Sequence, residues 1–261
     1  MLNYVKSEFY RISHTSMIPG ITGLLAGLAF MLNMILFLFD KNTDGFRYGT
    51  VSFSLSNLTA GMVSIFFVGM VMVSLMFTEE KKNGILKNAI AFGISREKIF
   101  FGKCLVSTVV SVCSLIIILV VYIGSAVLLL EPGVEPDAVM ITLRGVAAVL
   151  IMAVACEVLA IAFLTYFEKE ISGYIMFIVV IAFVPGICRI IGLKYELVGK
   201  IAAWMPYNYL NNMGGDTVIN MSGWSCIWET PEGMLKCLIS GMVSLIAFFI
   251  LGLCICKKQE V

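Results

Sequence analysis

Six uninterrupted apolar runs, each 20 to 27 residues long, constrain this chain more than any other feature. A helix needs about 20 apolar residues to cross the roughly 30 Å hydrocarbon core of a bilayer, and every run reaches that length. The strands of a membrane β-barrel would alternate apolar and polar residues, whereas these runs are apolar on every face. We therefore predict an all-α, polytopic membrane protein with a single transmembrane domain over residues 1–261 and spans at 18–39, 58–77, 104–130, 145–167, 171–192 and 237–256.

The overall composition excludes several other classes of protein. Hydrophobic residues make up 60% of the chain and charged residues 13%, whereas soluble domains carry about 25% charged residues. The net charge of +1 offers no electrostatic attraction for a nucleic acid. Seven of the eight cysteines fall inside or beside apolar spans and His14 is the only histidine, so we expect neither a disulfide framework nor a metal site.

The basic residues predict the orientation, because cytoplasmic loops of membrane proteins are enriched in Lys and Arg. Eleven of the eighteen lie in the N-terminal segment, the 78–103 connection, the 168–170 turn and the C-terminal tail. The loops on the other side carry seven. We predict that both termini are cytoplasmic.

Residues 1–17 precede the first run and have amphipathic helical spacing. Leu2, Val5, Phe9 and Ile12 recur at steps of three and four, which predicts a short interfacial helix on the inner leaflet. A frayed tail with accidental spacing is the alternative.

The 78–103 connection is longer than a loop between two spans requires, and it also has helical spacing. Its apolar residues recur at steps of three and four, Gly93 marks a helix stop, and Ser95 is an N-cap candidate for the next helix. Two interpretations are open: a helix that anchors the loop at the membrane surface, or one that docks into a cytoplasmic partner.

This connection carries a family resemblance. Residues 80–88 read EKKNGILKN, residues 93–99 read GISREKI, and Gly102-Lys103 leads into the third run. The pattern resembles the signature of type-2 ABC exporter permeases, although Ile85 stands where that family commonly has threonine. The resemblance implies that 78–103 is the coupling segment that sits in a groove of an ATPase subunit, through Glu80, Gly84, Ile85, Leu86, Asn88, Ser95 and Arg96.

The same resemblance covers the order of segments along nearly the whole chain. It implies a multi-pass protein of the bacterial cell membrane that pairs with a second permease copy, a homodimer being favoured, above two cytoplasmic ABC ATPase subunits. The sequence itself contains no phosphate-binding Gly-x-x-x-x-Gly-Lys-Ser/Thr motif and no visible catalytic set. We therefore expect no enzyme activity and no cofactor on this chain, with ATP and Mg²⁺ bound by the partner subunit.

Few polar residues interrupt the spans. Glu157, in the fourth run, is costly in hydrocarbon, so it either lines a substrate path or locks two helices together. Arg189 follows Pro185-Gly186, where we expect a bend, and its side chain can reach the headgroups. Gly23 and Gly27 permit close helix approach, either at a dimer seam or within the chain.

The outer segment 193–236 is rich in Trp and Tyr, which are typical of a membrane interface. In the resembling family this position holds re-entrant helices; a simple interfacial loop is the alternative.

These features favour the membrane subunit of an ATP-driven exporter of an amphipathic peptide or another lipophilic substrate, in contact with membrane lipid. Within the family, compact permeases resemble exporters of toxin or antimicrobial peptides. One alternative is a non-transporting membrane sensor or scaffold that recruits a cytoplasmic partner through 78–103. A secondary transporter is disfavoured, because the halves show no inverted hydropathy repeat.

Overall fold

The computed structural model describes residues 2–82, 89–133, 136–167, 169–210, 219–220, 223–224 and 227–258. Side chains are described for a slightly smaller set, which leaves out 78–82 among others. The first half contains helices α1 (Leu2–Ser13), α2 (Met17–Asn42), α3 (Val51–Ala60), α4 (Ser64–Lys82) and α6 (Arg96–Leu129). The second half contains α7 (Ala138–Tyr166), α8 (Glu170–Ile178), the π-helical turn η1 (Val179–Phe183), α9 (Val184–Gly192), α10 (Glu196–Trp204), α11 (Pro206–Leu210), the short strands β1 (Ile219–Asn220) and β2 (Gly223–Trp224), the 3-10 turn η2 (Ile227–Glu229) and α12 (Pro231–Lys258).

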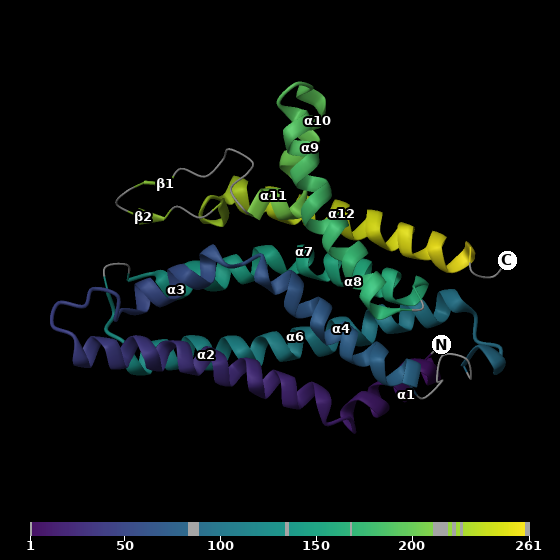
Figure 1. Cartoon of the computed structure of the whole chain (residues 1–261), viewed down its shortest axis with the longest axis horizontal. Coiled ribbons are helices and arrows are strands. Elements are labelled where there is room, and N and C mark those ends of the chain that lie inside the picture. Colours follow the sequence, from purple (N-terminus) through teal and green to yellow (C-terminus); the bar gives the residue numbers. More distant parts are fainter. Residues whose placement is uncertain are drawn as a thin grey trace.

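The long helices form an elongated bundle, and both chain termini lie at the same end of it (Figure 1). Among the described residues, five helical segments are long and apolar enough to span a membrane, and a bent pair of helices makes a sixth. The chain is therefore an all-helical, multi-pass membrane protein, as predicted. β1 and β2 add only a two-residue antiparallel pair.

The second predicted span is the bent pair. We expected one helix over 58–77, but α3 begins at Val51 and meets α4 at an angle of 68°. Thr50 caps the start of α3 by accepting a hydrogen bond from the Phe53 amide at 3.3 Å. At the other end the Gly61 amide donates to the carbonyls of Asn57 and Leu58, which closes α3 before α4 starts. Hydropathy did not indicate this break, since residues 60–63 read AGMV and carry no polar side chain.

Helix α7 forms the centre of the bundle. Its apolar stretch is 72% buried, against 17% for the Glu170–Gly192 segment. Small residues such as Ala148 and Ala155 are fully buried on it and admit close neighbours. Met152, Leu159 and Ile161 fill the core between α7 and the helices around it.

Four buried polar residues join α2, α3 and α6, and we call them the polar clamp: Asn33, Ser54, Tyr122 and Ser125. The Asn33 amide donates to the Tyr122 carbonyl at 2.9 Å and to the Ser125 hydroxyl at 2.8 Å. Ser54 donates to Asn33 Oδ1 at 2.6 Å, and the Tyr122 hydroxyl donates to the Ser54 carbonyl at 2.9 Å. The clamp lies toward the end of α6 that is remote from the two chain termini (Figure 1).

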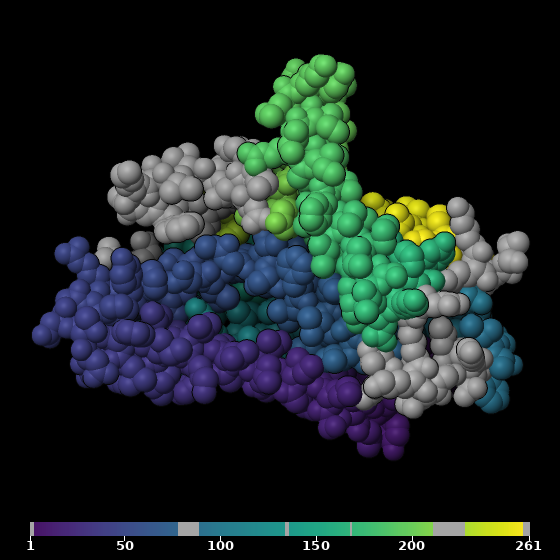
Figure 2. All heavy atoms as spheres, in the orientation of Figure 1, coloured from purple at the N-terminus to yellow at the C-terminus, as the bar shows by residue number. Residues whose placement is uncertain are grey.

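The fifth predicted span bends, as its proline indicated. The Val184 amide donates to the Val179 carbonyl, five residues back, which makes the turn before Pro185 π-helical. Beyond this turn, α9 and α10 project together from the side of the bundle, and Figures 1 and 2 both show this hairpin arm. Gly192 and Gly199 let the two helices touch, because a Cβ added to either glycine would meet the backbone of the other helix.

Part of the aromatic outer segment is packed inside the protein. Trp228 is 5% exposed, its indole N–H donates to the Ile141 carbonyl at 3.1 Å, and its ring occupies the space beside Gly145 of α7. Tyr209 is also buried, in the same core cluster. The described parts of this segment include short helices, so the expectation of a simple loop is wrong there.

Candidate functional site

The entry into α6 is built from the two local signals that the sequence contained. Gly93 has a φ of +79°, and the amides of Gly93 and Ile94 donate to the carbonyls of Ile90 and Ala89. This pair of bonds is a Schellman motif, which ends a helix at a left-handed residue. Ser95 then adopts an extended conformation as the N-cap of α6, without a side-chain capping bond, and Arg96 is the first residue of the helix.

The first two turns of α6 contact the C-terminal helix α12. Lys257 Nζ lies 3.3 Å from Glu97 Oε1. Phe100 is 1% exposed, and its ring centroid lies 5.8 Å from that of Phe249. A Cβ added to Gly252 would overlap the Phe100 ring, so this glycine permits the close approach of α6 and α12.

The same two turns also contact α1 and α4. A Cβ added to Gly102 would lie 2.8 Å from the ring of Tyr4, so the N-terminal helix packs on α6 at this glycine. Lys103 is 3% exposed, and its Nζ lies 3.9 Å above the centroid of the Phe77 ring in α4, within the range of a cation–π contact. We call Glu97, Phe100, Gly102 and Lys103, with these partners, the α6 hub.

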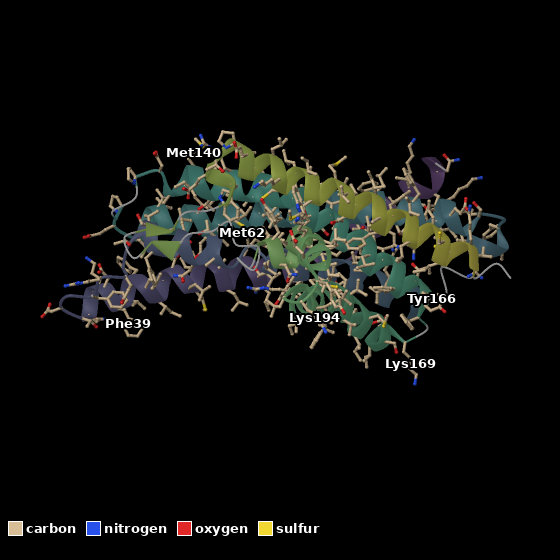
Figure 3. All side chains as sticks on the ribbon, turned by 90° about the horizontal axis from the view of Figure 1, so that it is seen from above. Phe39, Met62, Met140, Tyr166, Lys169 and Lys194 are labelled. Carbon is tan, nitrogen blue, oxygen red and sulfur yellow. The ribbon has the colours of Figure 1, made fainter. Side chains whose placement is uncertain are left out.

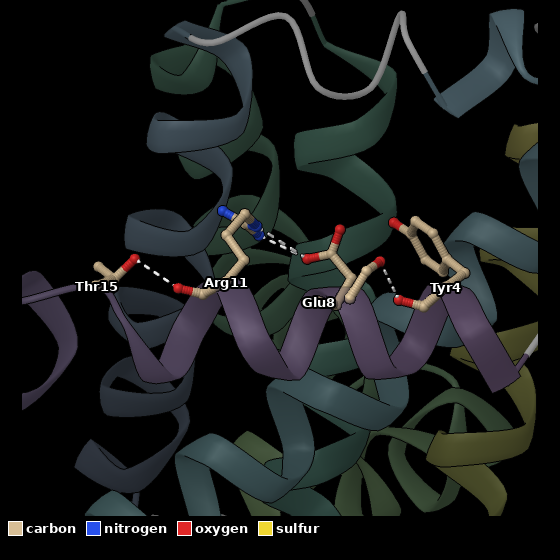
Figure 4. Close-up of polar contacts among 5 residues, drawn as sticks. Tyr4, Glu8, Arg11 and Thr15 are labelled. Atoms are coloured by element: carbon tan, nitrogen blue, oxygen red, sulfur yellow. Dashed lines mark hydrogen bonds and ion pairs between the residues drawn. The ribbon is translucent and has the colours of Figure 1, made fainter.

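Helix α1 is ordered by its own polar contacts and by its apolar face. Arg11 Nη2 lies 2.7 Å from Glu8 Oε2, and Figure 4 shows this pair along one side of the helix. Ile12 and its apolar neighbours on α1 pack against Met76 of α4 and Val106 of α6. The alternative of a frayed tail is therefore wrong, and part of the amphipathic face is covered by protein.

The structure places only some of the residues that we predicted for ATPase coupling. Ser95 and Arg96 lie directly before the hub. Glu80 is within helix α4 but its side chain is outside the described residues, and Gly84, Ile85, Leu86 and Asn88 lie wholly outside them. The coupling role of all seven stays a prediction. Phe100 was missed because it continues an apolar pattern, whereas Glu97 and Gly102-Lys103 were noted only as part of the family motif.

Glu157 lies inside the bundle, 2% exposed. Ser111 of α6 donates a hydrogen bond of 2.8 Å to Glu157 Oε1, so the carboxyl group joins α7 to α6. Both residues line a cavity of about 20 Å³ beside Gly69 of α4, which is large enough for one water molecule. The helix-locking interpretation is thus supported by a direct contact, and the substrate-path interpretation stays a prediction.

Gly23 and Gly27 face open space. A Cβ added to either would meet nothing within 4 Å, so the close-packing role within the chain that we considered is wrong. Helix α2 instead packs through Ile18, Thr22 and Ala26, and Thr22 donates to Ser114 of α6 at 3.0 Å.

Comparison with known proteins identifies the family. A family model described as "ABC-2 family transporter protein" matches residues 4–189, which is most of the chain. The chain belongs to the ABC-2 family of transporter proteins. No curated protein and no solved structure matched it.

As an ABC-2 family member, this chain is the membrane-spanning permease part of a transporter. That part lacks the ATPase, and ABC permeases pair with a separate ATPase subunit. The family implies no cofactor on this chain. The matched region includes most of α1, the connection to α6 and the α6 residues of the hub, but not their partners on α12.

Proposed function

We propose that this ABC-2 permease is the membrane subunit of an exporter that moves an amphipathic or hydrophobic substrate outward, a peptide being favoured. Two copies form a homodimer in the bacterial cell membrane, with both termini in the cytoplasm. Two ABC ATPase subunits bind beneath them and hold ATP and Mg²⁺. Closure of the ATPases switches the dimer between access to the two sides of the membrane.

The α6 hub is the observation that supports this proposal most strongly. It begins two residues after Ser95 and forms the C-terminal part of the 78–103 segment through which the ATPase is proposed to act. Within two turns of that point α6 touches α1, α4 and α12. A displacement of the segment would therefore reach four helices at once, because α6 continues without a break from Arg96 to Leu129.

The other segments have proposed roles around the α6 hub. Residues 1–17 form the interfacial helix of the inner leaflet, which the packing of α1 beside the hub would couple to α6. Residues 193–236 form the outer segment, with α10 and α11 as re-entrant helices that cap the path. Glu157 lies beside the path, next to a cavity that would widen when α4, α6 and α7 separate.

An amphipathic substrate agrees with the lining of the small cavity beside Glu157. Apart from Glu157, Ser111 and Gly69, its lining residues are aliphatic. A multiply charged substrate would find few partners there. ATP-dependent uptake of a labelled amphipathic peptide into inverted vesicles would measure this activity directly, because outward transport runs into the lumen of such vesicles.

The test of coupling uses the permease purified together with its ATPase subunit. Glu80→Gln and Gly84→Ala are expected to reduce ATP turnover by the complex and substrate export together, because both alter the proposed ATPase contact. Glu196→Gln on α10 and Gly20→Ala on α2 are the matched controls, and both should leave turnover unchanged. Gly20 suits this purpose because a Cβ there meets nothing within 4 Å.

Two outcomes would overturn the proposal. If the Glu80→Gln and Gly84→Ala variants turn over ATP and export substrate as the wild type does, the coupling segment lies elsewhere. If the ATPase binds through 78–103 but no substrate crosses the membrane under any nucleotide condition, the chain is the sensor or scaffold.

A further inference from the structure

A groove of about 640 Å³ lies where the arm leaves the bundle, between α9 and Tyr207 of α11. Its volume falls within the range of roughly 300–1,000 Å³ that is typical of small-molecule sites. The groove belongs neither to the α6 hub nor to the surroundings of Glu157. It is lined by Phe183, Gly186, Ile187, Arg189, Ile190 and Tyr207, among others.

The shape of the groove follows from helix periodicity. Phe183, Gly186 or Ile187, and Ile190 recur at steps of three or four, so they form one continuous stripe along η1 and α9. Ile187 and Ile190 are more than half exposed, at 52% and 69%, so no described part of the chain covers this stripe. Gly186 forms a low point in it, because a Cβ there would meet nothing within 4 Å.

Arg189 is the charged group of this groove. It is exposed, and no ion pair joins it to any residue that the structure describes. The nearest acidic residue along the arm, Glu196, already pairs with Lys200, whose Nζ lies 2.6 Å from Glu196 Oε1. The groove therefore combines a long apolar floor with one guanidinium that forms no ion pair with the described residues.

The charges of the arm also restrict where it can lie. Lys200 and Glu196 are largely exposed on α10, at 69% and 83% of their side chains, and charges facing hydrocarbon are costly. Lys194, labelled in Figure 3, lies at the turn of the arm and is exposed. The turn must therefore reach water or headgroups, and Arg189, one and a half turns earlier, can extend its guanidinium to the same level.

We propose that this groove binds an anionic phospholipid of the bilayer. The guanidinium of Arg189 donates two hydrogen bonds to the lipid phosphate, a geometry that matches its planar fork. One acyl chain lies along the stripe from Ile190 to Phe183 and covers apolar surface that the protein leaves exposed. The site is independent of ATP and of the transported substrate, so it would exist even if the proposed export function were wrong.

The test is native mass spectrometry of the purified full chain, alone or with its ATPase, after equilibration with mixed micelles that contain equal amounts of dioleoyl phosphatidylglycerol and dioleoyl phosphatidylcholine. The wild type should retain the anionic lipid about fivefold over the zwitterionic one, the preference expected from one basic residue at a membrane surface. Arg189→Gln should abolish this preference, and Arg189→Lys should restore part of it.

Two further variants locate the lipid. Gly186→Leu places a side chain in the groove at a position where an added Cβ meets nothing within 4 Å, so it should lower retention of both lipids while the protein stays folded. Lys200→Gln and Gly23→Leu are the matched controls, one removing a charge from the same arm and the other filling open space on α2, and neither should change retention.

Three results would overturn the inference. The first is that the wild type retains both lipids equally. The second is that Gly186→Leu binds as much lipid as the Gly23→Leu control. In the third, the groove would be occupied by a second copy of the chain or by an amphipathic peptide, seen as the corresponding mass without bound lipid.

Discussion

The two ends of α6 are held to neighbouring helices by different kinds of contact. The polar clamp fixes one end with directional hydrogen bonds of 2.6 to 2.9 Å from Asn33 and Ser54. The α6 hub holds the other end with aromatic rings packed on glycines and with one exposed ion pair. Hydrogen bonds restrict a helix to one geometry, whereas rings can slide over a glycine surface. The difference suggests a helix that pivots at the clamp and moves at the hub.

Of the substitutions that test this comparison, Phe100→Ala should lower the stability of the protein most. The ring is almost fully buried, so its removal is expected to lower the free energy of unfolding by about 3–5 kcal/mol. Titration with SDS in mixed micelles measures this quantity. Phe92→Ala is the matched control, because Phe92 is 86% exposed and should change stability by no more than about 0.5 kcal/mol. Equal effects at the two positions would show that the hub is not packed as described.

Gly102→Ala should cause the second largest loss of stability. The new Cβ would lie 2.8 Å from the Tyr4 ring, and such overpacking costs about 1–3 kcal/mol. The double variant with Tyr4→Ala should recover much of the loss, which a double-mutant cycle on the same unfolding assay would detect. Gly27→Ala, at an open position, should not destabilise the protein. If the stability losses of Gly102→Ala and Tyr4→Ala are strictly additive, α1 does not pack on α6 at this glycine.

Asn33→Leu tests the clamp. It removes three hydrogen bonds from a buried site, and we expect a loss of about 1–2 kcal/mol, because hydrogen bonds between membrane helices contribute modestly. Asn57→Leu is the control, since the Asn57 side chain is exposed and donates to the Phe53 carbonyl of its own helix. If Asn33→Leu lowers stability no more than the control does, the polar clamp does not fix this end of α6.

Glu97→Gln should have the smallest effect. The Glu97–Lys257 pair is exposed, with side chains 45% and 67% accessible, so the expected loss is below about 1 kcal/mol. Unfolding at low and high salt should show that the difference from the wild type vanishes at high ionic strength. A larger or salt-independent loss would mean that this pair stabilises α12 as strongly as Phe100 does.

Features set by local sequence were predictable. Apolar run length identified the membrane spans, Gly93 marked a helix end because it adopts a positive φ, and Ser95 marked a helix start. The spacing on α1 predicted a helix, although not that α6 would cover part of its apolar face. The irregularity next to Pro185, a π-helical turn that directly precedes it, was also predictable, because proline removes a backbone donor.

Features set by contacts between distant residues were not predictable. Trp228 is as suited to a membrane interface as to a buried site, and only the gap at Gly145 decides in favour of burial. The break between α3 and α4 lies in continuous apolar sequence, so hydropathy could not locate it. Glu157 is the intermediate case: its cost in hydrocarbon required a polar partner, but not Ser111 in particular.

The central claim is that the ATPase moves α6 at the hub and leaves the clamp end in place. The most direct test measures two distances by double electron–electron resonance, in the complex with the ATPase and with the native cysteines replaced. One spin-label pair, at Ser95 and Lys169, reports on the hub end, and another, at Asp44 and Glu131, reports on the clamp end; all four positions are exposed. We predict that trapping with ATP and vanadate shifts the first distance and leaves the second unchanged. An unchanged Ser95–Lys169 distance, or an equal shift at both ends, would contradict the account.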